Sequence, residues 1–502
     1  MKGKTRTTST LIVLANILKI ASMGLALVLL YRSVWFHGIV VSLPSPQEFR
    51  EDMCIVVTDA IRGKLLPYTK STMPLLTNVY GIIYPLVMAP VTAIFGSTYR
   101  THRITTWFFW MCSFLLTFYV LRKRKIPVGM AVIGIIIWYS QVLENQFDIL
   151  SRPEGLGELF FLLGICIPWI FHFRFASLIA SVILSLLGFF TKPYFILGAP
   201  IVFLYLLFFV SRKKAVLFGI VFSVFGITAF LVTQYLMEFY FYNTVLFHLK
   251  NARYFVSHMM LQTKVFTINN IGLVVLAVYG YANALRRRKI DYFQFLFLCF
   301  LLIVLGKLGG HDGNYLAYYT ELLVPLLLIA SFGSDVILRR EVFCHICIIA
   351  TLAILLLRSS SFLTIDRPAI LKNWGEWENL LSSYGKIYNT PPFAKYLSDA
   401  NKEIFDEGHT EYFTKSMTRL QIPLFDDARE AYNTHLHTLD RMIQNKEFDL
   451  IIRLKDYVQY DFLYTGYLSY FIEKNYSMRE IKPLLMYHNQ KLLFEVWERK
   501  KY

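Results

Sequence analysis

Two aspartates, Asp52 and Asp59, stand seven residues apart in the stretch EDMCIVVTDAIRGKLLPY, just after a long apolar run. At 100° per residue, this spacing places both side chains within about 20° of each other at the polar edge of a helix. Apolar side chains cover the other arc, which predicts a helix lying in the membrane interface and ending near Gly63 and Pro67. Both acids can then face a cavity above the membrane. A carboxylate at an apolar boundary is a candidate general base, because desolvation raises its pKa towards neutrality.

Basic side chains predicted on the same side of the membrane are candidates for holding a phosphate leaving group. They are Lys192 in TKPY, Arg152 in SRPE, Arg100 and Arg103 in STYRTHR, His311, Lys307, Lys250 and Arg253. Lys192 follows an apolar run, so its side chain can equally extend to the interface without binding anything. Asp148 and Glu154 flank the end of an apolar run and are either acceptor ligands or ordinary loop polarity.

The composition is that of an integral membrane protein. The 502 residues are 56% hydrophobic and only 17% charged, with a net charge of +17. The lysines and arginines fall in short clusters between apolar runs, which is a topology signal rather than a nucleic-acid-binding surface. We therefore expect no nucleic-acid partner.

The apolar runs predict about eleven spans, because each is close to the length that crosses a bilayer core. They cover residues 10–31, 104–121, 126–143, 155–173, 175–193, 196–210, 215–238, 268–284, 290–306, 315–332 and 342–357. One further run, Val79 to Phe95, is short and contains Pro85 and Pro90. If this run does not cross, the basic clusters 122–125, 211–214, 286–289 and 339–340 share the side of the basic N-terminus. We therefore predict a re-entrant or surface-lying segment, buried against protein.

This topology predicts a multi-pass protein of the cell (inner or plasma) membrane with a cytoplasmic N-terminus. Residues 1–357 are expected to form the transmembrane domain that carries the candidate base, with 32–103 as the first external loop carrying juxtamembrane helices. Residues 358–502 contain no spanning run. In this tail LDRMIQNKEFDLIIRL is typical of a helix followed by a strand, and KLLFEVWER of a closing strand. The tail is therefore expected to be a small external α/β domain.

Several motifs in this order resemble the GT-C class of polyprenyl-phosphate-sugar-dependent glycosyltransferases, which includes protein O-mannosyltransferases and the lipid A aminoarabinose transferase. The motifs are D-x(10)-G-x(3)-PY from Asp52, Y-x(3)-YP-x(4)-P-x(4)-FG from Tyr80, SRPEGLGELFFLLGI, TKPYFILGAP and GGHDGNYLAYYTELLVPLLL. The resemblance implies an inverting transferase with a GT-C-like polytopic helical fold, whose catalytic base is an acid of the first external loop. That role transfers to Asp52, with Asp59 and then Glu51 as the next positions. The same motifs supply predicted substrate contacts at Tyr68, Tyr84, Asp148, Glu154, Asp312, Asn314 and Tyr315.

The resemblance further implies a polyprenyl-phosphate sugar donor and a glycan, lipid or protein acceptor. Two or three acids near the site can hold Mg²⁺ or Mn²⁺, although carboxylate spacing alone does not require a metal ion. A polysaccharide polymerase or ligase using a polyprenyl-diphosphate-linked glycan is an alternative, and it would depend on external Arg and His rather than on Asp52. A lipid-carrier flippase or transporter is a second alternative. It is disfavoured because ionisable residues are nearly absent from mid-span positions, where a transport path would usually need them.

Overall fold

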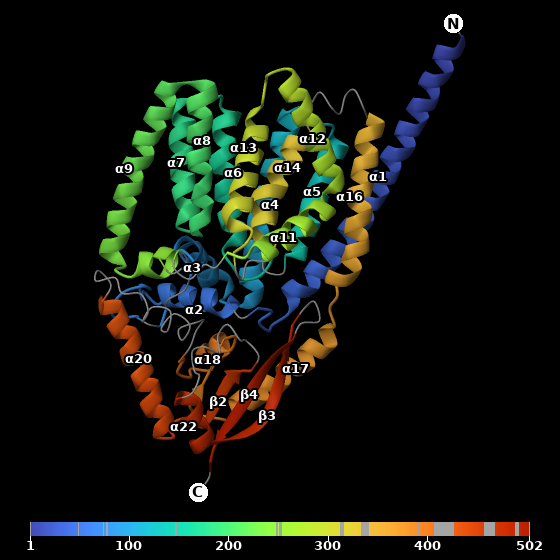
Figure 1. The fold of residues 1–502 in the computed structure, drawn as a ribbon. Helices are drawn as coiled ribbons and strands as arrows, with labels where there is room; N and C mark the ends of the chain where they lie inside the picture. Colours follow the sequence, from blue (N-terminus) through green and yellow to red (C-terminus); the bar gives the residue numbers. More distant parts are fainter. Residues whose placement is uncertain are drawn as a thin grey trace.

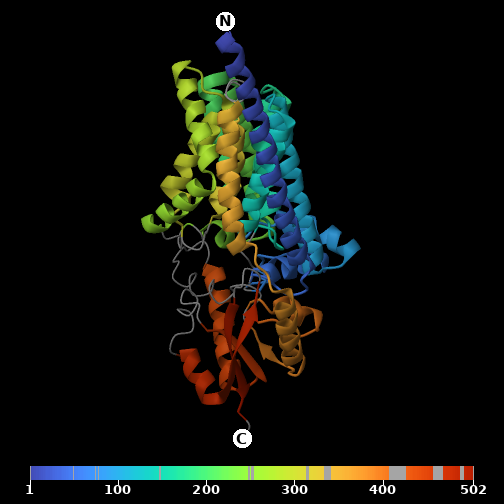
Figure 2. The same cartoon turned by 90° about the vertical axis from the view of Figure 1, so that its right-hand side faces the viewer.

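The computed structural model places a helical bundle above a smaller α/β unit, with the two chain termini at opposite ends of the molecule (Figures 1 and 2). It describes residues 2–48, 50–73, 75–76, 79–145, 148–246, 249, 254–311, 316–332, 341–389, 391–405, 426–455, 467–486 and 491–500.

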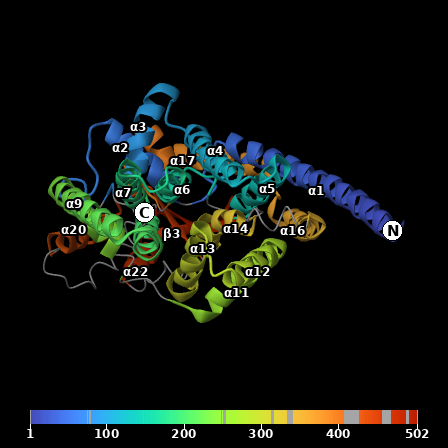
Figure 3. The same ribbon diagram turned by 90° about the horizontal axis from the view of Figure 1, so that it is seen from above.

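Every one of the eleven predicted spanning runs is largely helical. The bundle helices are α1 (Lys2–Ser42), α4 (Tyr99–Lys123), α5 (Val128–Glu144), α6 (Glu154–Ile170), α7 (Phe175–Phe189), α8 (Gly198–Tyr205), α9 (Arg212–Leu236), α11 (Val256–Asn269), α12 (Ile271–Arg286), α13 (Tyr292–Ile303), α14 (Val324–Ser331) and α16 (Glu341–Phe362). Short π-helical turns extend α8 over η2 (Leu206–Val210) and α13 over η4 (Val304–Leu308), and η5 (Tyr319–Leu323) leads into α14. Long α1 runs beside α16 along one side of the bundle, and α9 lies at the opposite edge (Figure 3).

The chain is a polytopic helical membrane protein. Among the described residues, five helices are long and apolar enough to cross a membrane, and the pair α11–α12, bent by 88°, makes a sixth if it counts as one span. The other predicted spans form shorter apolar helices. The count of eleven spans therefore stays a prediction.

Two further helices, α2 (Glu51–Arg62) and α3 (Ile83–Phe95), lie at the end of the bundle that faces the α/β unit (Figure 1). Helix α2 ends at Gly63, as predicted from the sequence. The expectation that the run 79–95 is buried against protein is only half right: α3 buries Tyr84 and Met88 but leaves Ile94 76% and Phe95 73% exposed. One face of α3 packs on the protein and the other is free to meet lipid.

The C-terminal unit, residues 367–499, is a mixed sheet with helices on both faces. Its strands are β1 (Ile387–Tyr388), β2 (Leu450–Leu454), β3 (Tyr476–Leu485) and β4 (Lys491–Arg499), in the order β1-β2-β4-β3, and only the pair β1–β2 is parallel. Strand β4 covers the residues KLLFEVWER, and the predicted helix and strand before it are α20 (Asp426–Gln444) and β2. The remaining helices are α17 (Arg367–Ser382), α18 (Ala394–Asp399) and α22 (Tyr467–Asn475).

Alternation along the strands explains the two layers of core in this unit, because successive side chains of a strand point to opposite faces. Leu450 and Ile452 of β2 pack with Trp377 of α17, whereas Ile451 packs with Ile443 of α20. The sheet therefore lies between α17 on one side and α20 and α22 on the other. Helix α18 of this unit contacts α2 (Figure 1).

Candidate active site

Asp52 is completely buried, with both carboxylate oxygens engaged. The Tyr99 hydroxyl of α4 donates a hydrogen bond to Oδ1, and the backbone N–H of Lys395 in α18 donates to Oδ2 at 2.9 Å. Burial raises the pKa of the Asp52 carboxyl to about 7, although these two hydrogen bonds oppose the shift. Asp52 can thus exist near neutral pH both as an acid and as a base, which is the property a general base requires.

Asp59 lies on the same face of α2 and contacts the same lysine. Its Oδ2 is 3.4 Å from Lys395 Nζ, and its Oδ1 is 3.3 Å from Arg62. The expectation that both acids face an open cavity is wrong for Asp52, because α18 packs directly over this face of α2. The seven-residue spacing does bring the two acids to one partner, and that partner comes from the C-terminal unit.

Glu51 forms a buried ion pair with Arg103, and neither side chain is exposed. The guanidinium bonds the carboxylate through Nε at 2.9 Å and Nη2 at 2.6 Å, and it donates its other N–H groups to the carbonyls of Val40, Leu43 and Ser45. Burial would raise the pKa of Glu51, but Arg103 outweighs it and holds the pKa below its ordinary value. All five N–H donors of Arg103 are therefore used within the protein. The geometry assigns Arg103 to holding the first loop, in place of the predicted phosphate contact.

The first loop meets the segment between α5 and α6 at this ion pair. The backbone N–H of Ser151 donates to Glu51 Oε1 at 2.8 Å, and the next residue, Arg152, lies 3.4 Å from Glu48 Oε2. Segments about a hundred residues apart in sequence are thereby fixed side by side, and the loop that carries Asp52 is tied to the segment that carries Arg152.

That cluster joins three of the predicted site residues. Arg152 Nη2 and Lys192 Nζ both bond the same Glu154 oxygen, at 2.6 and 2.8 Å. Arg152 also donates to the Tyr80 hydroxyl at 2.6 Å, and Lys192 Nζ lies 5.6 Å from the centre of the Tyr80 ring. Two cations converge on one anionic oxygen, so the arrangement suits a phosphate oxygen as well as a carboxylate.

Glycines decide how closely the elements of this cluster approach. A Cβ on Gly81 would lie 1.8 Å from the carbonyl oxygen of Phe190. The Gly81 N–H donates to the Thr191 carbonyl at 3.0 Å, which places Tyr80 beside Lys192. Similarly, a Cβ on Gly157 would lie 2.2 Å from the Phe195 ring, so glycine lets α6 pack on the turn after Lys192. Both close approaches exclude any larger residue.

Further acids lie beside the Glu154 cluster. Burial raises the pKa of Asp148 well above its ordinary value, and the nearby Glu321 and Glu154 carboxylates add to the shift. Glu321 of η5 accepts a hydrogen bond from Tyr194, and Glu158 of α6 is fully buried. Glu158 lies near the start of the predicted span 155–173 and Glu321 lies within 315–332, so Glu321 is an exception to the near absence of ionisable groups at mid-span positions.

The other predicted site residues lie elsewhere. Tyr68 is buried, its hydroxyl donating to the Tyr80 carbonyl at 2.7 Å, and Tyr84 bonds His102 and Thr106 between α3 and α4. Arg100 is exposed on the first turn of α4. His311 forms an isolated β-bridge with Tyr254 beside α11. Asp312, Asn314 and Tyr315 lie outside the described residues.

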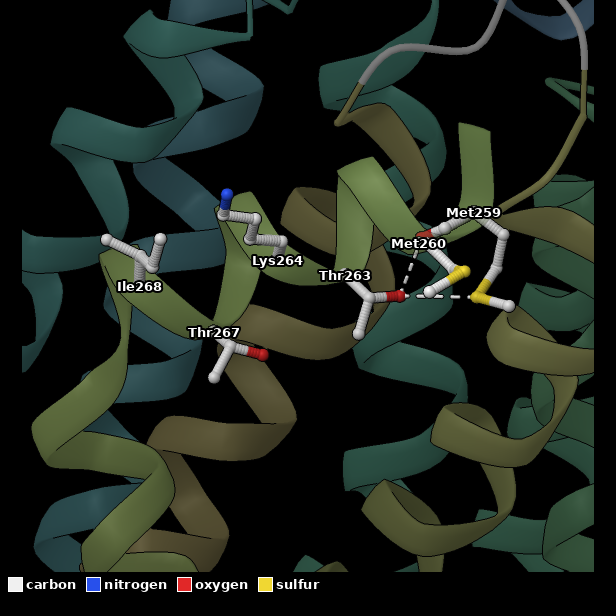
Figure 4. Close-up of a pocket in the computed structure, with 6 residues that line it drawn as sticks. All are labelled: Met259, Met260, Thr263, Lys264, Thr267 and Ile268. Atoms are coloured by element: carbon white, nitrogen blue, oxygen red, sulfur yellow. Dashed lines mark hydrogen bonds between the residues drawn. The ribbon is translucent and has the colours of Figure 1, made fainter. Parts of the chain in front are cut away.

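A pocket of about 380 Å³ lies on α11, away from the acids. Its lining residues all come from this one helix, as Figure 4 shows: Met259, Met260, Thr263, Lys264, Thr267 and Ile268. The Thr263 hydroxyl is bonded to the Met259 carbonyl at 2.7 Å. This shallow, largely apolar pocket has no acid or base among its lining residues apart from Lys264.

In the described part of the chain, no three His, Cys, Asp or Glu side chains are grouped so that they could hold a metal ion. The acids instead divide among separate cation partners: Glu51 with Arg103, Glu154 with Arg152 and Lys192, and Asp59 with Lys395. This arrangement does not group acids for the Mg²⁺ or Mn²⁺ that the sequence left open, and we assign no step to a metal.

Comparison with known proteins gives structural matches only. No protein-family model and no curated protein sequence matches the chain. The crystal structure of ArnT from Cupriavidus metallidurans in the apo state matches with a TM-score of 0.61 and 10% identity, over 98% of each chain. The crystal structure of the same protein bound to undecaprenyl phosphate matches with a TM-score of 0.52 and 10% identity, over 95% of this chain and 97% of that one.

The chain has the GT-C fold. The match to the apo structure extends over 98% of the chain. The sequence named Asp52, Asp59, Lys192 and Arg152 as separate candidates, and the structure brings Lys192 and Arg152 together on Glu154. The sequence did not name Tyr99, Lys395 or Glu321. Only Glu321 carried a signal in the sequence, as a carboxylate within an apolar run.

Proposed function

We propose that this GT-C protein is an inverting membrane glycosyltransferase. It transfers a sugar from a polyprenyl-phosphate-linked donor to a hydroxyl or amine of a glycan, lipid or protein acceptor. The observation that carries the proposal is the buried Asp52 carboxyl with its pKa near 7, held between Tyr99 and Lys395. The convergent cations Arg152 and Lys192 supply a second, separate element that the proposal uses.

In this mechanism Asp52 takes the proton of the acceptor as the acceptor oxygen or nitrogen attacks the anomeric carbon. The bond between that carbon and the phosphate oxygen breaks, and the phosphate leaves with the electron pair. One displacement inverts the configuration at the anomeric carbon. Lys192 and Arg152 stabilise the charge that develops on the leaving phosphate. Glu154 occupies their bonding positions in this structure, so the phosphate replaces it as their partner.

The donor class is supported by the GT-C fold together with the structure of ArnT bound to undecaprenyl phosphate. The apolar bundle beside the cation pair provides the membrane environment that a polyprenyl chain requires. The cell (inner or plasma) membrane is the proposed location.

Replacing Asp52 with Asn tests the function directly. Loss of the base should lower the rate of sugar transfer by about 10²- to 10⁴-fold. In cells whose only copy of the gene carries the substitution, sugar-loaded polyprenyl phosphate should therefore accumulate. Lipid extraction and mass spectrometry measure this pool whichever sugar the lipid carries. Asp427→Asn is the matched control, because Asp427 lies in α20 of the C-terminal unit, its side chain is 61% exposed, and it pairs with the exposed Lys70. Full transfer in Asp52→Asn and in Asp59→Asn would refute the base assignment.

We also propose that the N-terminus is cytoplasmic and that Asp52 and the C-terminal unit lie on the external face, as the charge distribution indicates. Reporters that are active only in the cytoplasm, fused after Arg124 and after Arg288, should be active. Silence at both positions would reverse the orientation.

A further inference from the structure

Besides the exposed pair Lys70–Asp427, two buried contacts of different kinds attach the C-terminal unit to the bundle end. At the first, Tyr432 of α20 is fully buried and its hydroxyl donates to Asn243 at 2.7 Å. Its ring packs among apolar residues of the bundle end, including Met53 of α2 and Tyr80. This contact is neutral and well packed, so it holds the unit in place independently of charge.

At the second contact, Lys395 of α18 reaches both acids of α2. Its backbone N–H bonds Asp52, its ammonium lies 3.4 Å from Asp59, and the ammonium also pairs with Asp399 of its own helix. The Lys395 side chain is only 5% exposed. This six-residue helix covers the candidate base, so water and acceptor are both kept from Asp52.

The hydroxyl or amine that receives the sugar must come within reach of the Asp52 carboxylate to give up its proton. It must therefore displace one of the two hydrogen-bond donors of Asp52, either Tyr99 or Lys395. Tyr99 lies on α4, which is packed into the bundle through Trp110 and Phe114. Lys395 lies on a six-residue helix, and it contacts α2 through its N–H to Asp52 and its ammonium to Asp59. The backbone N–H of Lys395 donates a hydrogen bond to Asp52 Oδ2. The hydroxyl or amine of the sugar acceptor would donate to the same oxygen.

We propose that α18 is a lid over the base, held closed by Lys395, and that it withdraws to admit the acceptor while Tyr432 keeps the rest of the C-terminal unit docked. The proposal rests on the proposed function, in which Asp52 is the base. Lys395 is then a positioning residue, and its N–H occupies the place of the acceptor's hydrogen-bond donor.

Hydrogen exchange of the full chain in nanodiscs tests the lid without any substrate. Lys395→Met removes the ammonium and keeps the backbone N–H, and Asp59→Asn removes the other end of the same pair. Each should accelerate exchange about two- to fivefold in peptides covering 51–62 and 394–399, since a single polar contact contributes modestly and the Lys395 N–H to Asp52 remains. The double variant should add little to either single variant. The matched control is Lys402→Met, because the Lys402 ammonium bonds the carbonyls of Leu381 and Tyr384 within the C-terminal unit. It should leave 51–62 unchanged.

Unchanged exchange at 51–62 in Lys395→Met would overturn the lid, and so would faster exchange spread over all of β2 to β4, which would indicate a merely structural lysine. In the transfer assay, Lys395→Met should lower the apparent KM for acceptor about two- to fivefold, because less work is needed to open the lid. A KM that is unchanged or higher would also count against the lid. If the exchange response occurs but the wild-type protein transfers no sugar, the proposed function fails and the lid stands.

Discussion

Tyr99 sets how readily Asp52 ionises, and Tyr99→Phe therefore provides a sharp test of Asp52 as the base. The hydroxyl donates to Asp52 Oδ1 and so favours the carboxylate over the neutral acid. Phenylalanine keeps the ring and removes only this donor. The remaining groups that act on Asp52, namely Glu51 and Lys395, are unchanged.

The magnitude follows from the pKa and from the strength of one hydrogen bond. A rise of the Asp52 pKa from 3.8 to about 7 corresponds to roughly 4 kcal/mol in favour of the neutral form. A hydrogen bond to a charged group contributes about 1.5–3 kcal/mol, so its loss should raise this pKa by roughly one to two units. A base must be deprotonated, so wild-type kcat/KM should increase about tenfold from pH 6 to pH 8. In Tyr99→Phe the increase should move to about pH 8–9.

The assay measures the initial rate at which membranes that contain the protein form polyprenyl phosphate from the sugar-loaded lipid, between pH 5.5 and pH 9.5. At pH 7 the variant should be about fivefold or more below wild type, and it should approach wild type as the pH rises. A uniform loss at every pH would show that Tyr99 is only structural. A wild-type rate that is flat from pH 6 to pH 8 would refute Asp52 as the titrating base.

Three further outcomes follow from the same contacts. Arg103→Met should lower the free energy of unfolding by about 3–5 kcal/mol, seen as a lower Tm, because it leaves Glu51 buried and unpaired; a Tm within a degree of wild type would contradict the structural role. Gly81→Ala should destabilise the protein by about 1–3 kcal/mol and lower sugar transfer, because the added Cβ would collide with the Phe190 carbonyl. The control is Gly38→Ala, which should be neutral or stabilising because the space around Gly38 is open. For Asp52→Asn, the Tm relative to wild type should rise between pH 5 and pH 8. The raised pKa of Asp52 means that the folded wild-type protein binds this proton more tightly than the unfolded chain does. The wild-type protein therefore loses stability as the pH rises through about 7. A Tm difference between the two proteins that stays constant with pH would show that Asp52 is not the buried titrating group.

The sequence by itself determined the elements of this protein. Apolar runs of spanning length became the bundle helices, and Gly63 ended α2 where expected. Period-two alternation located β4 to the residue. These features depend on backbone geometry and on burial of neighbouring side chains, so a short window of sequence contains the information they need.

Only the tertiary structure decided what the charged residues do. From the sequence, Arg103 was a candidate phosphate ligand. In the structure its five N–H donors bond Glu51 and three backbone carbonyls, which lie up to 63 residues away along the chain. Lys395 had no motif at all, and it meets Asp52 across a separation of 343 residues. A charge in a buried setting is defined by whichever partners the fold brings to it, because desolvation makes an unpaired charge costly. The acids of α2 could therefore be ranked from the sequence, but their environment could not.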